Sequence, residues 1–302
     1  MNGLPVWIWF NVALVALLAL DLLVLHRQAR PVRIREALFG SALWIGLALA
    51  FAAGLWRFEG RAPALQFLTG YVIEESLSAD NLFVIMMLLS HFAVPERYQH
   101  RVLFWGILGA MVMRLGLIVA GVTLIQKLHF LTYVFGAIVI FAGVQLLRKP
   151  EPEMNPAKSP ALRLLKRFLP ITEDLAGGQF LARRDGRWVA TPLLAALVVI
   201  EFADLTFAVD SVPAVLAVSR DAFIVYSSNA LAILGLRSLY FALAGLMRVF
   251  HHLSTGISLI LIFVGAKMLI SDWIEIPIAI TLVVILATLG ASVAVSWRRR
   301  AS

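Results

Sequence analysis

Acidic side chains in two otherwise apolar segments are the residues of this chain best suited to do chemistry. The first segment, 70–85, has the sequence GYVIEESLSADNLFVI, and the second, 198–216, has the sequence VVIEFADLTFAVDSVPAVL. A charged side chain at the centre of a membrane-spanning segment costs about 3 kcal/mol or more unless a partner, water or an ion satisfies it. We therefore expect these acids to serve a function.

The two segments share a pattern: an acid, five further residues, then an aspartate followed by a small polar residue. The pattern occurs at Glu74, Asp80 and Asn81 in the first segment and at Asp204, Asp210 and Ser211 in the second. Six residues turn a regular helix by about 240°, so the two acids of a pair would face different directions. Gly70, Ser76 and Ser78 in the first segment and Pro213 in the second could allow a local break of the helix, since unwound backbone is tolerated where it lines a polar cavity.

The side chains in these segments offer only oxygen atoms as metal ligands. The candidate ligands are Glu74, Glu75, Asp80, Asn81, Glu201, Asp204, Asp210 and Ser211. Hard divalent ions such as Mn²⁺, Mg²⁺ and Ca²⁺ prefer oxygen, whereas Zn²⁺ and Cu⁺ prefer histidine and cysteine. The chain has no cysteine, and its six histidines fall in loops or at the ends of apolar segments. The sequence therefore predicts a site for a hard divalent cation.

Three bases also lie inside apolar segments, namely Arg114, Arg237 and Lys267. Seven acids, including Asp21 of the first apolar segment, lie inside apolar segments and outnumber these three bases. A bound cation would reduce the surplus, and so would protonation, so the same acids could exchange protons for metal. Arginine has no free lone pair for a metal. We interpret the three bases as charge-balancing partners.

The elements that must position these residues are membrane-spanning helices. The chain is 61% hydrophobic and 15% charged, against about 25% charged in a soluble domain. A span needs about 20 apolar residues. Nine segments qualify, at about 5–25, 37–56, 64–90, 102–126, 130–147, 191–218, 223–247, 253–270 and 276–297. This predicts an all-α polytopic membrane protein with a single transmembrane transporter domain over 1–302.

The basic residues predict the orientation of the nine spans. With the N-terminus outside, the inner segments hold 19 Lys and Arg and the outer segments hold four. Positive charge favours the cytoplasmic side, so we expect the N-terminus outside and the C-terminus inside. The segment 148–190 is then a cytoplasmic loop. We expect a mobile start to it, an amphipathic helix in LRLLKRFLP and a hairpin around Asp185-Gly186.

Spans three to five resemble spans six to eight. GILG at 106–109 matches AILG at 232–235, and FAGVQLL at 141–147 matches FVGAKML at 263–269. Because span three would run inward and span six outward, the two triplets would form an inverted repeat. Transporters of this kind bind their substrate near the middle of the membrane, where the repeats meet.

Several classes of protein are excluded or disfavoured. The chain has no phosphate-binding Walker motif and no H-E-x-x-H motif, and no Ser/His/Asp set stands out, so we expect no enzyme activity and no permanently bound cofactor. The net charge of +8 is explained by cytoplasmic loops and indicates no nucleic-acid partner. The expected partners are the lipid bilayer and the metal ion. Protein partners are unknown, and 148–190 is the segment where one could bind.

The two acidic segments resemble the two signatures of the TerC/Alx family of bacterial membrane proteins, and FVGAKML resembles a later span of that family. The resemblance implies a transporter related to the LysE type in the bacterial inner membrane. It implies Mn²⁺ export, metal homeostasis and a link to tellurium resistance. The family often has Glu-Lys-Ser where this chain has Glu74-Glu75-Ser76, so Glu74 matches the family glutamate and Glu75 replaces a base.

Three functions remain open from the sequence. The first is a divalent-cation exporter, with Mn²⁺ as its cargo and possible proton coupling. The second is a membrane-bound redox modulator or stress-response scaffold without transport, although the absence of cysteine argues against direct thiol chemistry. The third is an organic-solute exporter of the LysE type.

Overall fold

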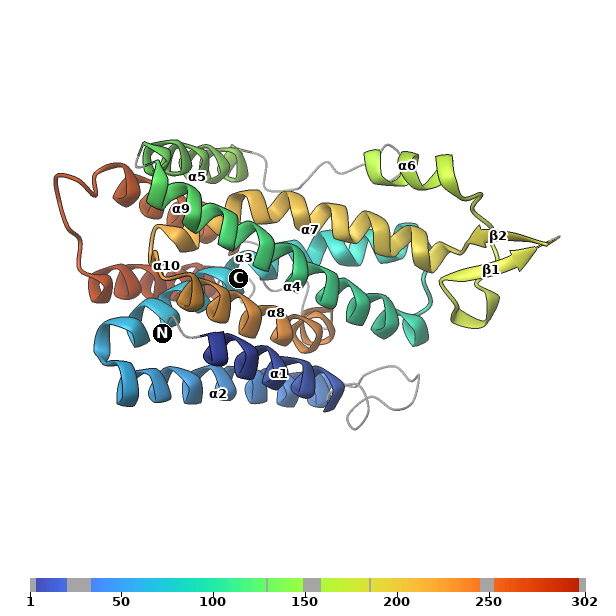
Figure 1. The fold of residues 1–302 in the computed structure, drawn as a ribbon, viewed down its shortest axis with the longest axis horizontal. Helices are drawn as coiled ribbons and strands as arrows, with labels where there is room; N and C mark the ends of the chain where they lie inside the picture. Colours follow the sequence, from blue (N-terminus) through green and yellow to red (C-terminus); the bar gives the residue numbers. More distant parts are fainter. Residues whose placement is uncertain are drawn as a thin grey trace.

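The computed structural model is a bundle of long helices with a small helix and hairpin at one end (Figure 1). It describes residues 4–20, 34–128, 130–148, 159–184, 186–244 and 253–298. The first part contains α1 (Leu4–Leu20), α2 (Ile34–Glu59), α3 (Arg61–His91), α4 (Glu96–Lys127) and α5 (Leu131–Arg148). The second part contains α6 (Pro160–Phe168), α7 (Pro192–Leu216), α8 (Ala222–Ala244), α9 (Leu253–Leu269) and α10 (Ile278–Arg298).

Each of the nine predicted spans coincides with one helix. Among the described residues, five helices are long and apolar enough to cross a membrane, within α2, α4, α5, α7 and α10, and shorter apolar stretches lie in α1, α8 and α9. The helix α3 has 31 residues but carries the acids of the first segment. The chain is therefore a mostly helical membrane protein. Nine spans and their orientation stay predictions.

The outer surface of the bundle is apolar, as a lipid-facing surface must be. Large apolar side chains on four different helices are each more than 60% exposed, namely Phe39, Val112, Phe141 and Val283. In water such a surface would be costly, whereas lipid tails match it. The polar side chains described below lie inside the bundle instead.

The helices of the two predicted repeats pack in exchanged pairs. α3 packs on α8, α4 packs on α7, and α5 packs on α9. The C-terminal half of α3 shares a hydrophobic cluster with the N-terminal half of α7. The N-terminal half of α3 shares the larger cluster with the C-terminal half of α7. The two helices therefore run in opposite directions (Figure 1). This set of pairs stays the same when α3, α4 and α5 are exchanged with α7, α8 and α9.

The α5–α9 pair is joined through the glycines of the two matching motifs. A Cβ atom on Gly143 would lie 2.8 Å from the carbonyl oxygen of Ser258 in α9. A Cβ atom on Gly265 would lie 2.8 Å from the carbonyl oxygen of Gly136 in α5. Small residues allow helix backbones to approach closely in membranes. The motif resemblance thus has a packing role in both helices.

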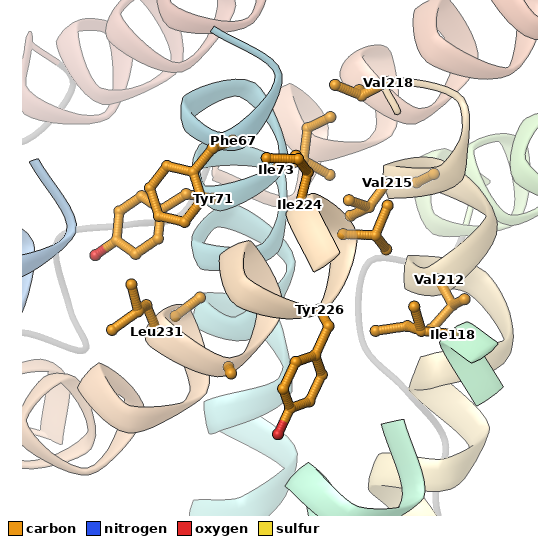
Figure 2. Packing of buried hydrophobic residues seen from close by; sticks show 14 of the residues in the cluster. Phe67, Tyr71, Ile73, Ile118, Val212, Val215, Val218, Ile224, Tyr226 and Leu231 are labelled. Atoms are coloured by element: carbon orange, nitrogen blue, oxygen red, sulfur yellow. The ribbon is translucent and has the colours of Figure 1, made fainter. Parts of the chain in front are cut away.

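A buried apolar cluster fixes α3, α7 and α8 against one another. Figure 2 shows Phe67 and Tyr71 of α3, Val212 and Val215 of α7, and Tyr226 of α8 within this cluster. These side chains are all at most 5% exposed. The cluster holds the three helices that carry the acidic and amide residues of the site.

The segment between α5 and α7 contains the expected helix and hairpin. β1 (Leu181–Arg184) pairs antiparallel with β2 (Arg187–Ala190), with Leu181 opposite Ala190. Gly186 has a φ of 75°, a left-handed conformation that suits glycine in a tight turn. The helix α6 packs on α7. The expected mobile start, 149–158, lies outside the described residues, as does Asp21.

Candidate functional site

Arg114 of α4 lies at the centre of a buried polar group. Its Nη1 donates to a carboxylate oxygen of Glu74 and to Oδ1 of Asn229 at 3.0 Å. Its Nη2 donates to Oδ1 of Asp204 at 3.1 Å, and Nη1 lies 3.3 Å from Oγ of Ser211. We call these five residues the Arg114 cluster. One guanidinium therefore joins α3, α4, α7 and α8.

The cluster is removed from solvent, which makes its pairing energetically important. The side chain of Glu74 is completely buried and that of Arg114 is 2% exposed, while that of Asp204 is 18% exposed. Taking charges out of water is expensive, and removing one partner of a buried pair leaves the other uncompensated. The guanidinium and the two carboxylates must therefore act as one unit.

The helices that present these side chains are unbroken. Asp204 and Ser211 are seven residues apart, close to two full turns, so a regular helix places both on the same face. The structure shows α7 as one helix from Pro192 to Leu216 and α3 as one helix from Arg61 to His91. The local break expected near Gly70, Ser76, Ser78 or Pro213 is therefore wrong: Glu74 and Asp204, one acid from each segment, meet at Arg114 without it.

Two further carboxylates lie at helix contacts close to the cluster. The carboxylate of Glu201 in α7 packs directly against the α-carbon of Gly109 in α4. Oε1 of Glu75 in α3 lies 4.0 Å from the position of a Cβ atom on Gly235 in α8. Gly109 and Gly235 are the last residues of GILG and AILG, so each repeat places a glycine beside an acid of the other repeat.

Three carboxylate oxygens in this region are buried without a hydrogen-bond donor. They are Oε2 of Glu74, Oε2 of Glu75 and Oε2 of Glu201, in the part of the chain that the structure describes. A buried acceptor without a donor is costly and calls for an explanation. An ion, a water molecule or a proton would satisfy each of these oxygens.

The remaining predicted site residues lie elsewhere or lack a described side chain. The helices α3, α7 and α8 include Asp80, Asp210 and Arg237, but their side chains are outside the described residues. Asn81 is half-buried in α3 and is not an acceptor for Arg114. Lys267 donates to Thr281 of α10 at 3.0 Å and lines a separate cavity of about 830 Å³.

The described side chains do not form a ready metal centre. No three histidine, aspartate or glutamate side chains among them lie together in a way that could hold a metal ion. Between Glu74 and Asp204 lies the guanidinium of Arg114. In the structure these two predicted ligands thus bind a cation that belongs to the protein itself.

Asn229 of α8 was not among the candidate ligands above, and the structure gives it a central place in the Arg114 cluster. It is 1% exposed, and its Nδ2 donates to the carbonyl oxygen of Val225 at 3.1 Å. This bond orients Oδ1 toward Arg114, from which it is separated by 115 residues in the chain. The signal available in the sequence was a polar amide within an apolar segment that follows the second acidic segment.

Comparison with known proteins identifies the family of this chain. The sequence profile described as "Integral membrane protein TerC family" matches residues 59–302. The chain belongs to the TerC family. The match extends over α3 to α10, so all five residues of the Arg114 cluster lie in the family region of this TerC protein.

The relatives of this TerC protein cover nearly its whole length. An uncharacterized membrane protein of Myxococcus xanthus is 48% identical over 290 residues, which cover 96% of this chain and 91% of the relative. A protein of Escherichia coli K12 named "Putative membrane-bound redox modulator Alx" is 43% identical, covering 95% and 92%. Its namesake in Salmonella typhi is 43% identical, covering 97% and 94%. No solved structure matches the chain.

Proposed function

We propose that this TerC protein exports a divalent cation, Mn²⁺, from the bacterial cytoplasm across the inner membrane. The observation that carries the proposal is the group of buried carboxylates at the meeting of α3, α4, α7 and α8, with three acceptor oxygens that have no donor among the described residues. Intramembrane acids of this kind mark ion pathways and proton relays in membrane proteins. The ion is the cargo of the protein rather than a resident cofactor.

The helix arrangement supports transport by alternating access. The pairs α3–α8 and α4–α7 are interchanged when the two repeats are exchanged, and α3 and α7 run in opposite directions. Inverted repeats place the substrate site at their interface, and rocking of one repeat against the other then exposes the site to either side. The carboxylates of Glu74 and Asp204 come one from each repeat.

Oxygen ligands support a hard divalent ion as the cargo, and the choice of Mn²⁺ rests on the resemblance to the TerC/Alx family. The same ligands suit Ca²⁺, so a direct comparison of the two ions belongs in the test. In an exchange for protons, the same carboxylates would carry protons in the direction opposite to the metal ion. We propose no enzyme activity, and the LysE-type relation stays a prediction.

A redox function is the second candidate because relatives of this chain carry that name. The chain contains no cysteine, so its own side chains perform no thiol–disulfide exchange. A redox role would therefore act through another protein or through the metal supply. The cytoplasmic loop 148–190 is the segment expected to bind such a partner, and its deletion tests this candidate.

Cellular manganese, measured by mass spectrometry, tests the proposal. The wild type and the Glu201→Gln and Asp210→Asn variants are produced at equal membrane levels in an exporter-deficient bacterium challenged with Mn²⁺. We expect lower manganese with the wild type and no reduction with either variant. Glu59→Gln is the matched control, because Glu59 is an exposed acid at the end of α2.

The outcomes separate the candidates. Equal manganese in cells with the wild type, the variants and an empty vector would refute manganese export. A reduction that survives Glu201→Gln and Asp210→Asn but disappears when the loop is deleted would favour the partner-dependent function. Repeating the challenge with Ca²⁺ shows whether the site distinguishes the two ions.

A further inference from the structure

We propose that the guanidinium of Arg114 is a tethered competitor of the transported ion, which must displace it from Asp204 before the two repeats can move. The inference rests on the proposed function, since it names how the same site is controlled. It starts from the observation that two predicted ligands, Glu74 and Asp204, are both occupied by Arg114.

The first step concerns space. Oxygen atoms of Glu74, Asp204, Ser211 and Asn229 all lie within 3.5 Å of nitrogen atoms of one guanidinium. A metal ion bound by the carboxylates of Glu74 and Asp204 would need the volume that this guanidinium fills. Ion binding at this point and full pairing of Arg114 therefore exclude each other.

The second step concerns which parts of the molecule Arg114 connects. Arg114 and Glu74 belong to the first repeat, whereas Asp204, Ser211 and Asn229 belong to the second. The contact with Glu74 thus lies inside one repeat, and the other contacts cross to the other repeat. Displacing the guanidinium from Asp204 breaks an ionic link between the two repeats, whereas displacing it from Glu74 does not.

The third step concerns the ligands that remain for the ion. Glu201 lies three residues before Asp204 on α7, so both side chains project from the same side of the helix. Oε2 of Glu201 is buried and has no donor among the described residues. An ion that takes Asp204 therefore has a second carboxylate within one turn of the same helix.

The competition also separates ions by charge. A tethered guanidinium has a high local concentration and one positive charge, so a monovalent ion gains little by replacing it. A divalent ion interacts about twice as strongly with each carboxylate at equal distance. The arrangement therefore favours divalent over monovalent cations without any difference in ligand type.

Binding of Mn²⁺ to the purified full chain in lipid nanodiscs tests the inference. The loss of the free-ion paramagnetic resonance signal gives the dissociation constant directly. Asn229→Leu removes one acceptor from the guanidinium while both carboxylates stay. We expect its dissociation constant for Mn²⁺ to fall about ten-fold, the effect of losing one hydrogen bond to a charged group. Weaker or unchanged binding by this variant would overturn the inference.

A second variant and a second measurement guard against misfolding. Arg114→Gln leaves Glu74 and Asp204 without their cation, so we expect a lower unfolding temperature that Mn²⁺ restores more strongly than in the wild type. Arg148→Gln, at the exposed end of α5, is the matched control. If Mn²⁺ leaves the lowered unfolding temperature of Arg114→Gln unchanged, Arg114 only stabilises the fold and does not compete with the ion.

The wild type distinguishes the failure of the inference from failure of the proposed function. If the wild type binds Mn²⁺ and neither Asn229→Leu nor Arg114→Gln binds it more tightly, only the inference fails. If none of the three proteins binds Mn²⁺ and none lowers cellular manganese, both fail. Binding by Arg114→Gln alone would support the inference, since it shows that Arg114 masks the site.

Discussion

The carboxylate of Glu201 in α7 lies against the bare α-carbon of Gly109 in α4, so that no side chain separates the acid from the neighbouring helix. The contact joins the second acidic segment to the GILG motif of the first repeat. Glycine at this place leaves room for the acid, since a Cβ atom on residue 109 would collide with both carboxylate oxygens and Glu201 would have to move.

We predict that Gly109→Ala abolishes manganese export, because the added methyl group must push Glu201 out of its position. Gly116→Ala is the control on the same helix, since a Cβ atom there meets nothing within 4 Å. Cellular manganese at equal membrane levels is the measurement. Retained export in Gly109→Ala would mean that the position of Glu201 does not matter for transport.

A second prediction concerns the α5–α9 contact. Gly265→Ala places a methyl group 2.8 Å from the carbonyl oxygen of Gly136, so the two backbones must separate. We expect a loss of about 1–3 kcal/mol in the free energy of unfolding, as for other overpacked positions. Gly290→Ala on α10, where nothing lies within 4 Å, should be neutral or stabilising. Thermal unfolding in detergent compares them, and equal unfolding temperatures would contradict the close contact.

The buried ion pair predicts a large difference from an exposed one. Glu74→Gln removes a carboxylate from the buried guanidinium of Arg114 and should cost about 3–5 kcal/mol of unfolding free energy. Arg184→Gln breaks the exposed pair with Asp174, in which the Arg184 side chain is 61% exposed and the Asp174 side chain is 59% exposed. This change should cost less than about 1 kcal/mol of unfolding free energy. Denaturation of both variants measures the difference, and similar costs would show that Glu74 is protonated or solvated in place.

The orientation of the chain can be tested because no natural cysteine interferes. We predict that Arg184→Cys in the hairpin is labelled by a membrane-impermeant maleimide only after the cells are permeabilised. Glu59→Cys at the end of α2 should be labelled in intact cells, since it lies on the outer side in the predicted topology. The reverse labelling would place the N-terminus inside.

The helices were predictable because apolar length and charge are properties of the local sequence. All nine predicted spans correspond to helices, and the hairpin formed with Gly186 between its two short strands. The helix break was not needed, because Glu74 and Asp204, one acid from each of two helices, meet at Arg114. Spacing within one helix does not indicate which acids of different helices meet.

The partners within the site were harder to predict, since they depend on packing between distant helices. Asn229 and Arg114 are 115 residues apart, and only the α4–α8 contact brings them together. Lys267 is also an intramembrane base, yet packing of α9 against α10 directs it to Thr281 instead. The sequence pattern of acids and bases could not distinguish these two cases.

The hairpin of β1 and β2 is joined to α7 without a flexible spacer. Thr191 donates through Oγ1 to the carbonyl oxygen of Gln179 at 2.7 Å, and the amide of Ala190 donates to the carbonyl oxygen of Pro170 at 2.8 Å. The hairpin is therefore held in a fixed position at the N-terminal end of α7. A small tilt of the helix that carries Glu201 and Asp204 therefore becomes a larger displacement at the far end of the hairpin.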